Sequence, residues 1–226
     1  MRVLKHLLLS LLAIGGLASV PASATTLTID IVSEPGITPG RMLFNGNGGV
    51  GSTIQFPNGS DGYDFVVAGS SDTALIGLKG NITGSFSIGA ISAVGPAQFA
   101  PVSNTGTFSI FDGANTLTAD LQLLSIGTLG TSVGLNLNGD PNLSNFAYTG
   151  GNTSLLALSG VNDASLVLSG QFSHPTSLLS LTANKAVNSA VYSGTLQATV
   201  PEASSYLFLA AGLMAAGFSM RNRRLQ

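Results

Sequence analysis

Residues that commonly do acid–base chemistry are scarce in the middle of this chain. Residues 25–199 contain one histidine, His174, and histidine is the commonest general base. A nucleophilic triad would combine it with a serine and an aspartate, but serine is so abundant that such a set can be assembled anywhere. The chain has no cysteine, which excludes thiolate catalysis, disulfides and finger-type zinc sites. Because Pro175 follows His174, we predict a solvated loop residue with no catalytic role.

Carboxylates offer a second kind of chemistry. Asp61 and Asp64 lie close together in the segment 58–64, which also holds two glycines. Oxygen ligands at alternating positions of such a loop can bind Ca²⁺, although the spacing and closing glutamate of an EF-hand are absent. Asp61 and Asp64 are therefore weak calcium candidates, and their alternative role is that of turn residues. We predict no metal site and no cofactor.

Two further kinds of site have requirements that can be compared with the sequence. A polysaccharide hydrolase would need two carboxyl groups about 5–10 Å apart in one cleft, and Glu34 is the only glutamate in the body of the chain. A carbohydrate-binding site would use an aromatic platform; without tryptophan, the candidates are Tyr63, Tyr148 and Tyr192. Packing in the core or in a hairpin is the alternative for each tyrosine.

The elements that must position these residues read as strands. Polar and apolar residues alternate in seven runs, at 26–31, 82–88, 106–110, 117–123, 133–137, 165–169 and 191–200. Period-two alternation indicates one buried and one wet face. Turn signals such as Asp112-Gly113 separate the runs. No run between the two ends has the pattern of an amphipathic helix, so we predict an all-β body, an antiparallel β-sandwich of roughly eight to twelve strands with a barrel as the alternative.

Charge excludes one class of partner. Charged residues make up 8% of the 226 residues, against about 25% in an ordinary soluble domain. The net charge is −2, and the stretch from residue 25 to residue 199 holds three basic and nine acidic residues. This acidic, weakly charged body predicts no nucleic-acid partner.

The N-terminus has the three parts of a secretory signal. Arg2 and Lys5 precede an apolar run at 7–18, and Ala22-Ser23-Ala24 follows it. Signal peptidase accepts small residues at the first and third positions before its cut, so we predict cleavage between Ala24 and Thr25. A retained anchor is the alternative, although the run is short for a membrane span.

The C-terminus reads as a membrane segment. Residues 203–220 carry no charge and include the apolar stretch 207–220, which is near the minimum length of a spanning helix. The basic cluster Arg221, Arg223 and Arg224 follows, and the positive-inside rule keeps such a cluster cytoplasmic. The body would then lie on the outer side of the membrane, in agreement with the signal peptide.

This tail resembles the PEP-CTERM sorting signal of Gram-negative bacteria, which joins a Pro-Glu-Pro motif, one apolar helix and a terminal arginine cluster. Val200-Pro201-Glu202 matches the start of the motif, and Ala203 replaces its second proline. The resemblance covers residues 200–226 and implies processing by an exosortase, a membrane cysteine protease, after passage through the inner membrane. It also implies a cell-surface or extracellular location and association with exopolysaccharide.

The sequence thus predicts three segments: a signal peptide at 1–24, an all-β extracellular domain at 25–199 and a sorting signal at 200–226. We expect an exported surface or matrix protein that is not an enzyme. Its expected partners are signal peptidase and exosortase during export, the inner membrane transiently, and exopolysaccharide. A secreted polysaccharide hydrolase and a calcium-dependent carbohydrate-binding module are the alternatives.

Overall fold

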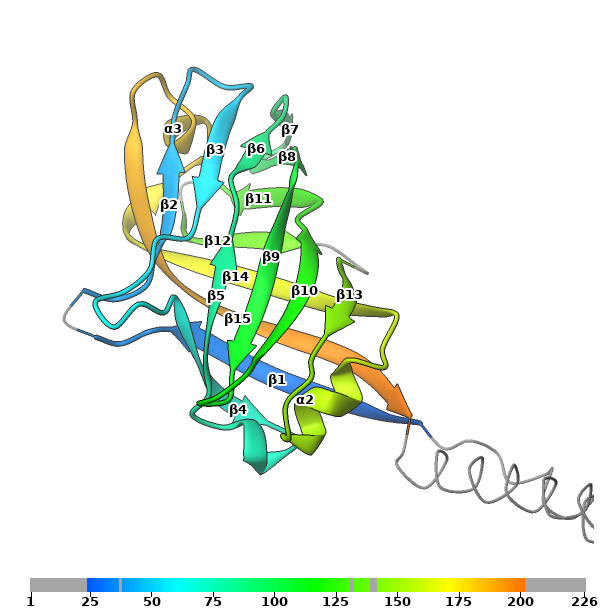
Figure 1. Cartoon of the computed structure of the whole chain (residues 1–226). Helices are drawn as coiled ribbons and strands as arrows, with labels where there is room; N and C mark the ends of the chain where they lie inside the picture. Colours follow the sequence, from blue (N-terminus) through cyan, green and yellow to red (C-terminus); the bar gives the residue numbers. More distant parts are fainter. Residues whose placement is uncertain (1–23, 37, 131, 139–141, 202–226) are drawn as a thin grey trace, which may run out of the picture. The chain divides into compact units, whose positions relative to one another are not determined.

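The computed structural model describes residues 24–36, 38–130, 132–138 and 142–201, and more than half of these residues lie in antiparallel strands (Figure 1). The strands are β1 (Ala24–Ser33), β2 (Met42–Asn45), β3 (Ser52–Gln55), β4 (Phe65–Ser70), β5 (Lys79–Thr83), β6 (Phe86–Ile88), β7 (Ser92–Val94), β8 (Ala97–Ser103), β9 (Thr105–Phe111), β10 (Thr116–Gln122), β11 (Ser125–Leu129), β12 (Ser132–Asn138), β13 (Leu143–Ala147), β14 (Asp163–Thr176) and β15 (Val187–Pro201). Three short helical turns join them, at η1 (Thr73–Leu75), α2 (Thr153–Leu158) and α3 (Leu178–Leu181). The predicted all-β antiparallel class is therefore confirmed.

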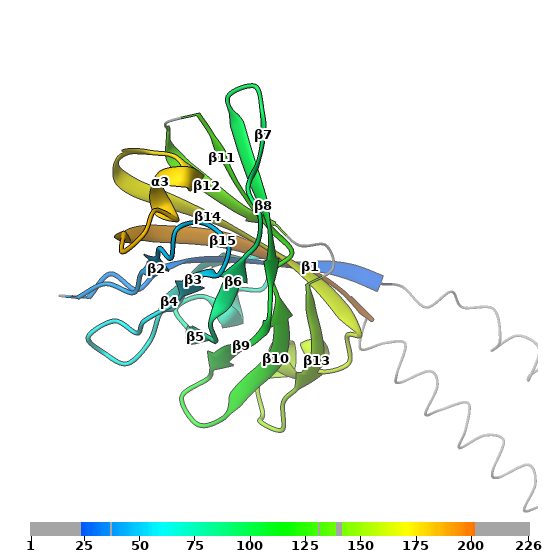
Figure 2. The ribbon, with the colours of Figure 1, turned by 90° about the horizontal axis from the view of Figure 1, so that it is seen from above.

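One antiparallel sheet contains all fifteen described strands, in the order β11-β12-β14-β13-β10-β9-β5-β4-β1-β15-β2-β3-β6-β8-β7. Two further pairings, β11 with β8 and β14 with β15, join strands that stand apart in this order. The paired strands therefore form two closed circuits. One is β14-β13-β10-β9-β5-β4-β1-β15, and the other is β11-β12-β14-β15-β2-β3-β6-β8. The circuits share β14 and β15, which lie side by side in both ribbon views (Figure 2).

Alternation along the strands builds the core. In β9, Phe108 and Ile110 are fully buried while Ser109 between them is partly exposed. Phe108 stacks on Phe65 of β4, with ring centroids 5.3 Å apart and planes 13° from parallel. Contacts between Cα atoms set residues 26–199 apart as one compact unit.

Turn chemistry also follows the sequence. The β9–β10 hairpin closes at Asp112-Gly113, where the Asp112 Oδ1 accepts hydrogen bonds from the backbone N–H groups of Ala114, at 2.8 Å, and Asn115, at 2.6 Å. Gly113 has a φ of 100°, which glycine adopts without steric cost. This aspartate and glycine thus act as the turn residues that the sequence predicts.

Three expectations about the body are wrong in detail. The alternating run 82–88 is two strands, because Gly84 breaks it with a φ of 128° and β5 and β6 pair with different partners. The described strands exceed the expected eight to twelve, and short helices occur where none was expected. These helices have six residues or fewer, too few for a helical period to show in the sequence.

The ends of the chain lie largely outside the described residues. The signal peptide up to residue 23 does so, as do Glu202, Ala203, the apolar segment 207–220 and the cluster Arg221, Arg223 and Arg224. In the described part of the chain, no helix is both long enough and apolar enough to span a membrane.

Candidate functional site

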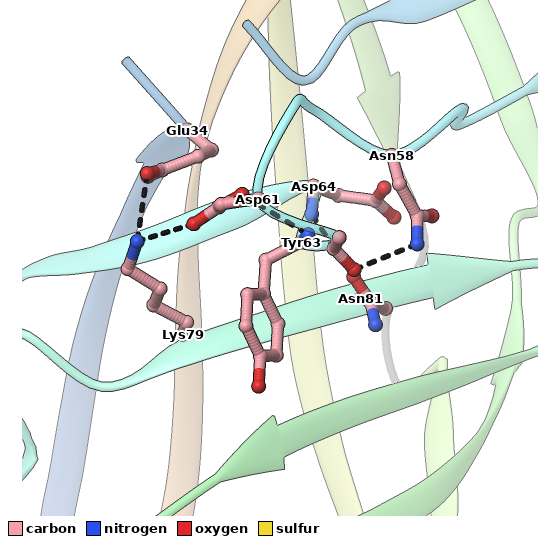
Figure 3. Close-up of polar contacts among 8 residues, drawn as sticks. Glu34, Asn58, Asp61, Tyr63, Asp64, Lys79 and Asn81 are labelled. Carbon is pink, nitrogen blue, oxygen red and sulfur yellow. Dashed lines mark hydrogen bonds and ion pairs between the residues drawn. The ribbon is translucent and has the colours of Figure 1, made fainter. Parts of the chain in front are cut away.

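A basic residue joins two of the acids that the sequence singles out. Lys79 begins β5, Glu34 follows β1 and Asp61 lies in the loop between β3 and β4. The Lys79 Nζ donates to Glu34 Oε1 at 2.8 Å and to Asp61 Oδ2, forming two ion pairs (Figure 3). Nζ also lies 5.9 Å from the ring centroid of Tyr63. Three segments distant in sequence thus meet at one ammonium group.

These ion pairs shift the pKa of two members of the cluster. Its hydrogen bond to Lys79 holds the pKa of the Asp61 carboxyl below its usual value. Hydrogen bonds to Asp61 and then to Glu34 raise the pKa of the Lys79 ammonium. A glycosidase general acid needs a raised pKa, so the chemistry of Asp61 does not suit that role. The Lys79 ammonium lies between the two carboxylates, where a cation would otherwise be attracted.

Asp64 belongs to a different environment from Asp61. Its side chain points away from the Lys79 cluster (Figure 3) and is fully buried. Its Oδ2 accepts from the backbone N–H of Ile82 at 2.6 Å, and its own backbone N–H donates to Asn81 Oδ1 at 2.9 Å. Burial raises the pKa of the Asp64 carboxyl to about 7. The two calcium candidates, three residues apart in sequence, thus direct their carboxylates to different partners.

Within the described residues, no group of three or more His, Asp or Glu side chains is arranged to hold a metal ion. Asp72, a neighbour of the candidates in sequence, caps η1 by accepting from the Ala74 backbone N–H at 3.0 Å, and it also bonds the hydroxyl of Ser154. Asp72 thus ties η1 to the first turn of α2.

His174 is exposed but lies near the end of β14, not in a loop as expected. Its Nδ1 is 2.9 Å from the Ser173 hydroxyl. The β12–β14 register shifts beside this stretch, between Ser132 and Gly134, and such an irregularity tolerates a proline within a strand. The sequence at 130–134 matches the Gly-x-Ser-x-Gly pattern of a nucleophile elbow, in which a serine stands at a turn from a strand into a helix. Here a strand, β12, begins at Ser132, so the segment does not form such an elbow.

The candidate tyrosines do not form a sugar platform. Tyr192 is buried at 3% exposure and packs edge-on against Phe56, with centroids 5.4 Å apart. Tyr148 is also buried, and its hydroxyl bonds to the Asp112 carboxylate. Tyr63 is partly exposed and stacks on Phe111, with centroids 6.1 Å apart. The packing alternative therefore holds for all three.

An open groove of about 300 Å³ lies elsewhere, on the outer face of β8, β11, β12 and β14. Two of its lining residues, Gly127 and Gly134, have no side chain. The ring of Phe99 lies over Gly127: a Cβ placed there would be 2.9 Å from the ring. Sequence reasoning missed Phe99, since its strand, Ala97–Ser103, alternates too weakly to reveal an aromatic on the wet face.

The first and last strands of the body pair with each other. The Thr195 hydroxyl of β15 donates to Asp30 Oδ1 of β1 at 2.7 Å, and the Tyr192 backbone N–H donates to Ser33 Oγ at 2.7 Å. These two contacts show that β1 and β15 are antiparallel, because residue numbers fall along one strand as they rise along the other. Continuing the same register to the ends of the strands brings Thr26 beside Thr199. Both ends of the compact unit therefore leave from the same end of one strand pair (Figure 1).

The structure describes four residues of the two predicted processing points. Ala24 and Thr25, at the predicted signal-peptidase cut, begin β1, and Val200 and Pro201, in the predicted sorting motif, end β15. Ala22 lies outside the described residues. In comparisons with protein-family models, curated proteins and solved structures, the chain matches none.

Proposed function

We propose that this chain is an exported protein displayed at the surface of a Gram-negative cell, where it works without catalysis in adhesion, matrix structure or polysaccharide association. The observation that supports this best is the pairing of β1 with β15. It brings together the two ends of the body, which lead to the signal peptide and to the sorting tail. With its two ends side by side, the body keeps its remaining surface available for contacts.

The proposed route begins with signal peptidase, which cuts between Ala24 and Thr25. The tail then holds the protein in the inner membrane, with Arg221, Arg223 and Arg224 on the cytoplasmic side. An exosortase reads Val200 to Ala203 and passes the body to the cell surface or the medium. For the body itself, the two closed pairing circuits favour the barrel alternative over the sandwich.

Truncation within the tail tests this proposal. Because β15 ends at Pro201, a chain that stops there keeps its last strand. We expect this chain to appear in the periplasm or medium, while the full chain is found first in the inner membrane and then at the surface. Immunoblots of cell fractions would measure both, with resistance of the body to protease as the check on folding.

The matched variant replaces Arg221, Arg223 and Arg224 by serine and leaves the rest of the tail intact. It should impair processing without changing the body. If the chain that ends at Pro201 reached the same surface location as the full chain, the sorting proposal would be wrong.

A further inference from the structure

The groove on the outer face has an unusual chemical lining. The ten described residues that line it are all uncharged: Ala97, Phe99, Gly127, Thr128, Leu129, Gly134, Leu135, Asn136, Ser169 and Gly170. Phe99 is 49% exposed, which is high for an aromatic ring because burial of such rings is a large source of stability. The groove thus presents an apolar ring to solvent beside amide and hydroxyl groups.

Strand register places these groups in a straight row. Phe99 pairs with Gly127, Gly127 with Asn136, and Asn136 with Ser169. Ser169 in turn pairs with Ser193 of β15. Neighbouring strands lie about 4.8 Å apart, so the row extends about 19 Å across the sheet. A row of this length and direction suits an extended chain molecule lying across the strands.

A hydrogen bond fixes the orientation of the polar side chains in this row. The Ser169 hydroxyl donates to Asn136 Oδ1 at 2.9 Å. With Oδ1 acting as an acceptor, the amide directs its Nδ2 hydrogens elsewhere as donors. A bound molecule would therefore meet a donor at Asn136, a hydroxyl at Ser169 and an aromatic face at Phe99.

We propose that this groove binds a neutral polysaccharide built from hexopyranose rings. Such a ring has an apolar face of C–H groups, which packs on an aromatic side chain, and a rim of hydroxyls, which hydrogen-bond to amides and hydroxyls. The uncharged lining favours a neutral sugar over an acidic one, because no residue of the groove offers a cation to a carboxylate. This inference deepens the proposed function by naming the ligand class, and it rests on that function only for the encounter at the cell surface.

The absence of tryptophan from the chain allows a direct test. Phe99→Trp would place a single fluorophore in the groove while keeping an aromatic face there. The full chain would be extracted in a detergent without a sugar head group and titrated with hydroxyethyl cellulose and galactomannan, both neutral, and with polygalacturonate. We expect a saturable shift of the emission to shorter wavelength with at least one neutral polymer.

Leu156→Trp is the matched control, because Leu156 on α2 is 51% exposed, almost as much as Phe99, and lies outside the groove. Its emission should not change. Affinity electrophoresis of the native chain, which has no tryptophan, should show binding that Phe99→Ala weakens roughly tenfold. Asn136→Ala and Ser169→Ala, which keep the ring, should each weaken it by a smaller factor.

No saturable shift with either neutral polymer would overturn the inference, as would equal shifts for the two tryptophan variants or a response to polygalacturonate alone. The sorting proposal is tested separately by cell fractionation. A chain that is sorted normally and binds no neutral polymer would refute this inference alone. A chain that binds but is not sorted would refute only the proposed function.

Discussion

The side chain of Asp64 is fully buried, and one oxygen of its carboxylate accepts a hydrogen bond from the backbone N–H of Ile82 at 2.6 Å. Its other oxygen, Oδ1, and the hydroxyl of Tyr192 are buried without a hydrogen-bond partner in the part of the chain that the structure describes. Burial and then the charge of Asp64 raise the pKa of the Tyr192 hydroxyl. A buried acid with one unsatisfied oxygen stabilises the fold better when it is neutral.

This environment predicts that stability falls as pH rises. The folded pKa of Asp64 is about 7 against an ordinary value of 3.8, so between these values the folded state holds a proton that the unfolded state has lost. The free energy of unfolding should therefore fall between about pH 4 and pH 7, by up to about 1.4 kcal/mol per unit. Asp64→Asn should flatten this slope in urea titrations, and the exposed Asp163→Asn should not. Parallel slopes for Asp64→Asn and the native chain would refute the assignment.

The Lys79 cluster predicts a response to calcium. Lys79→Met removes the ammonium that separates Glu34 from Asp61 and leaves two carboxylates side by side. We expect this variant to melt at a lower temperature than the native chain at pH 7, because two like charges then lie close together without a cation between them. Millimolar Ca²⁺ should raise its melting temperature, measured by circular dichroism, and chelator should reverse the rise. The native chain, whose carboxylates already hold a cation, should respond less; an equal response would contradict this account.

The stability of the fold should depend strongly on the buried side-chain amide of Asn142. Its Nδ2 donates to the carbonyl of Leu166 at 2.8 Å and its Oδ1 accepts from the Leu166 N–H at 2.6 Å, so the side chain stands in for a neighbouring strand. Asn142→Leu leaves both backbone groups buried without partners, which should cost about 1–3 kcal/mol for each. Asn184→Leu, at an exposed position in the turn before β15, is the control and should cost less. Chemical denaturation would measure both, and equal losses would refute this role.

The stacked pair in the core predicts a large packing effect. Phe108 is fully buried against Phe65, and Phe108→Ala should lower the free energy of unfolding by about 3–5 kcal/mol through lost burial and the cavity left behind. Phe111→Ala, on the same strand but partly exposed, should cost less. Urea unfolding of the two variants would compare them, and a smaller loss for Phe108→Ala would place the core elsewhere.

The strand class was predictable because alternation is local. The run 106–110 lies within β9 and the run 117–123 lies almost wholly within β10, since each strand has one buried and one exposed face. Strands such as β7, with three exposed residues, carry no such signal. The break at Gly84 was also hidden, because a glycine in an alternating run shows its φ only when the chain is folded.

Sites were harder to predict than strands. Asp61 and Asp64 looked equivalent in sequence, but pairing with a lysine eighteen residues from Asp61 and burial of Asp64 separate their chemistry. The groove depends on register among β8, β11, β12 and β14, which composition cannot supply. A groove whose lining residues come from different strands can be recognised only when those strands are paired.

The pairing of β1 with β15 also determines how the body responds to mechanical force. When the two adjacent ends near Thr26 and Thr199 are pulled apart, the load acts across the strands, and the hydrogen bonds open one after another from that end. The contact between Thr195 and Asp30 lies a few residues inside and would be reached early. Tension between the ends therefore unzips the body, whereas tension along β15 would have to shear many hydrogen bonds together.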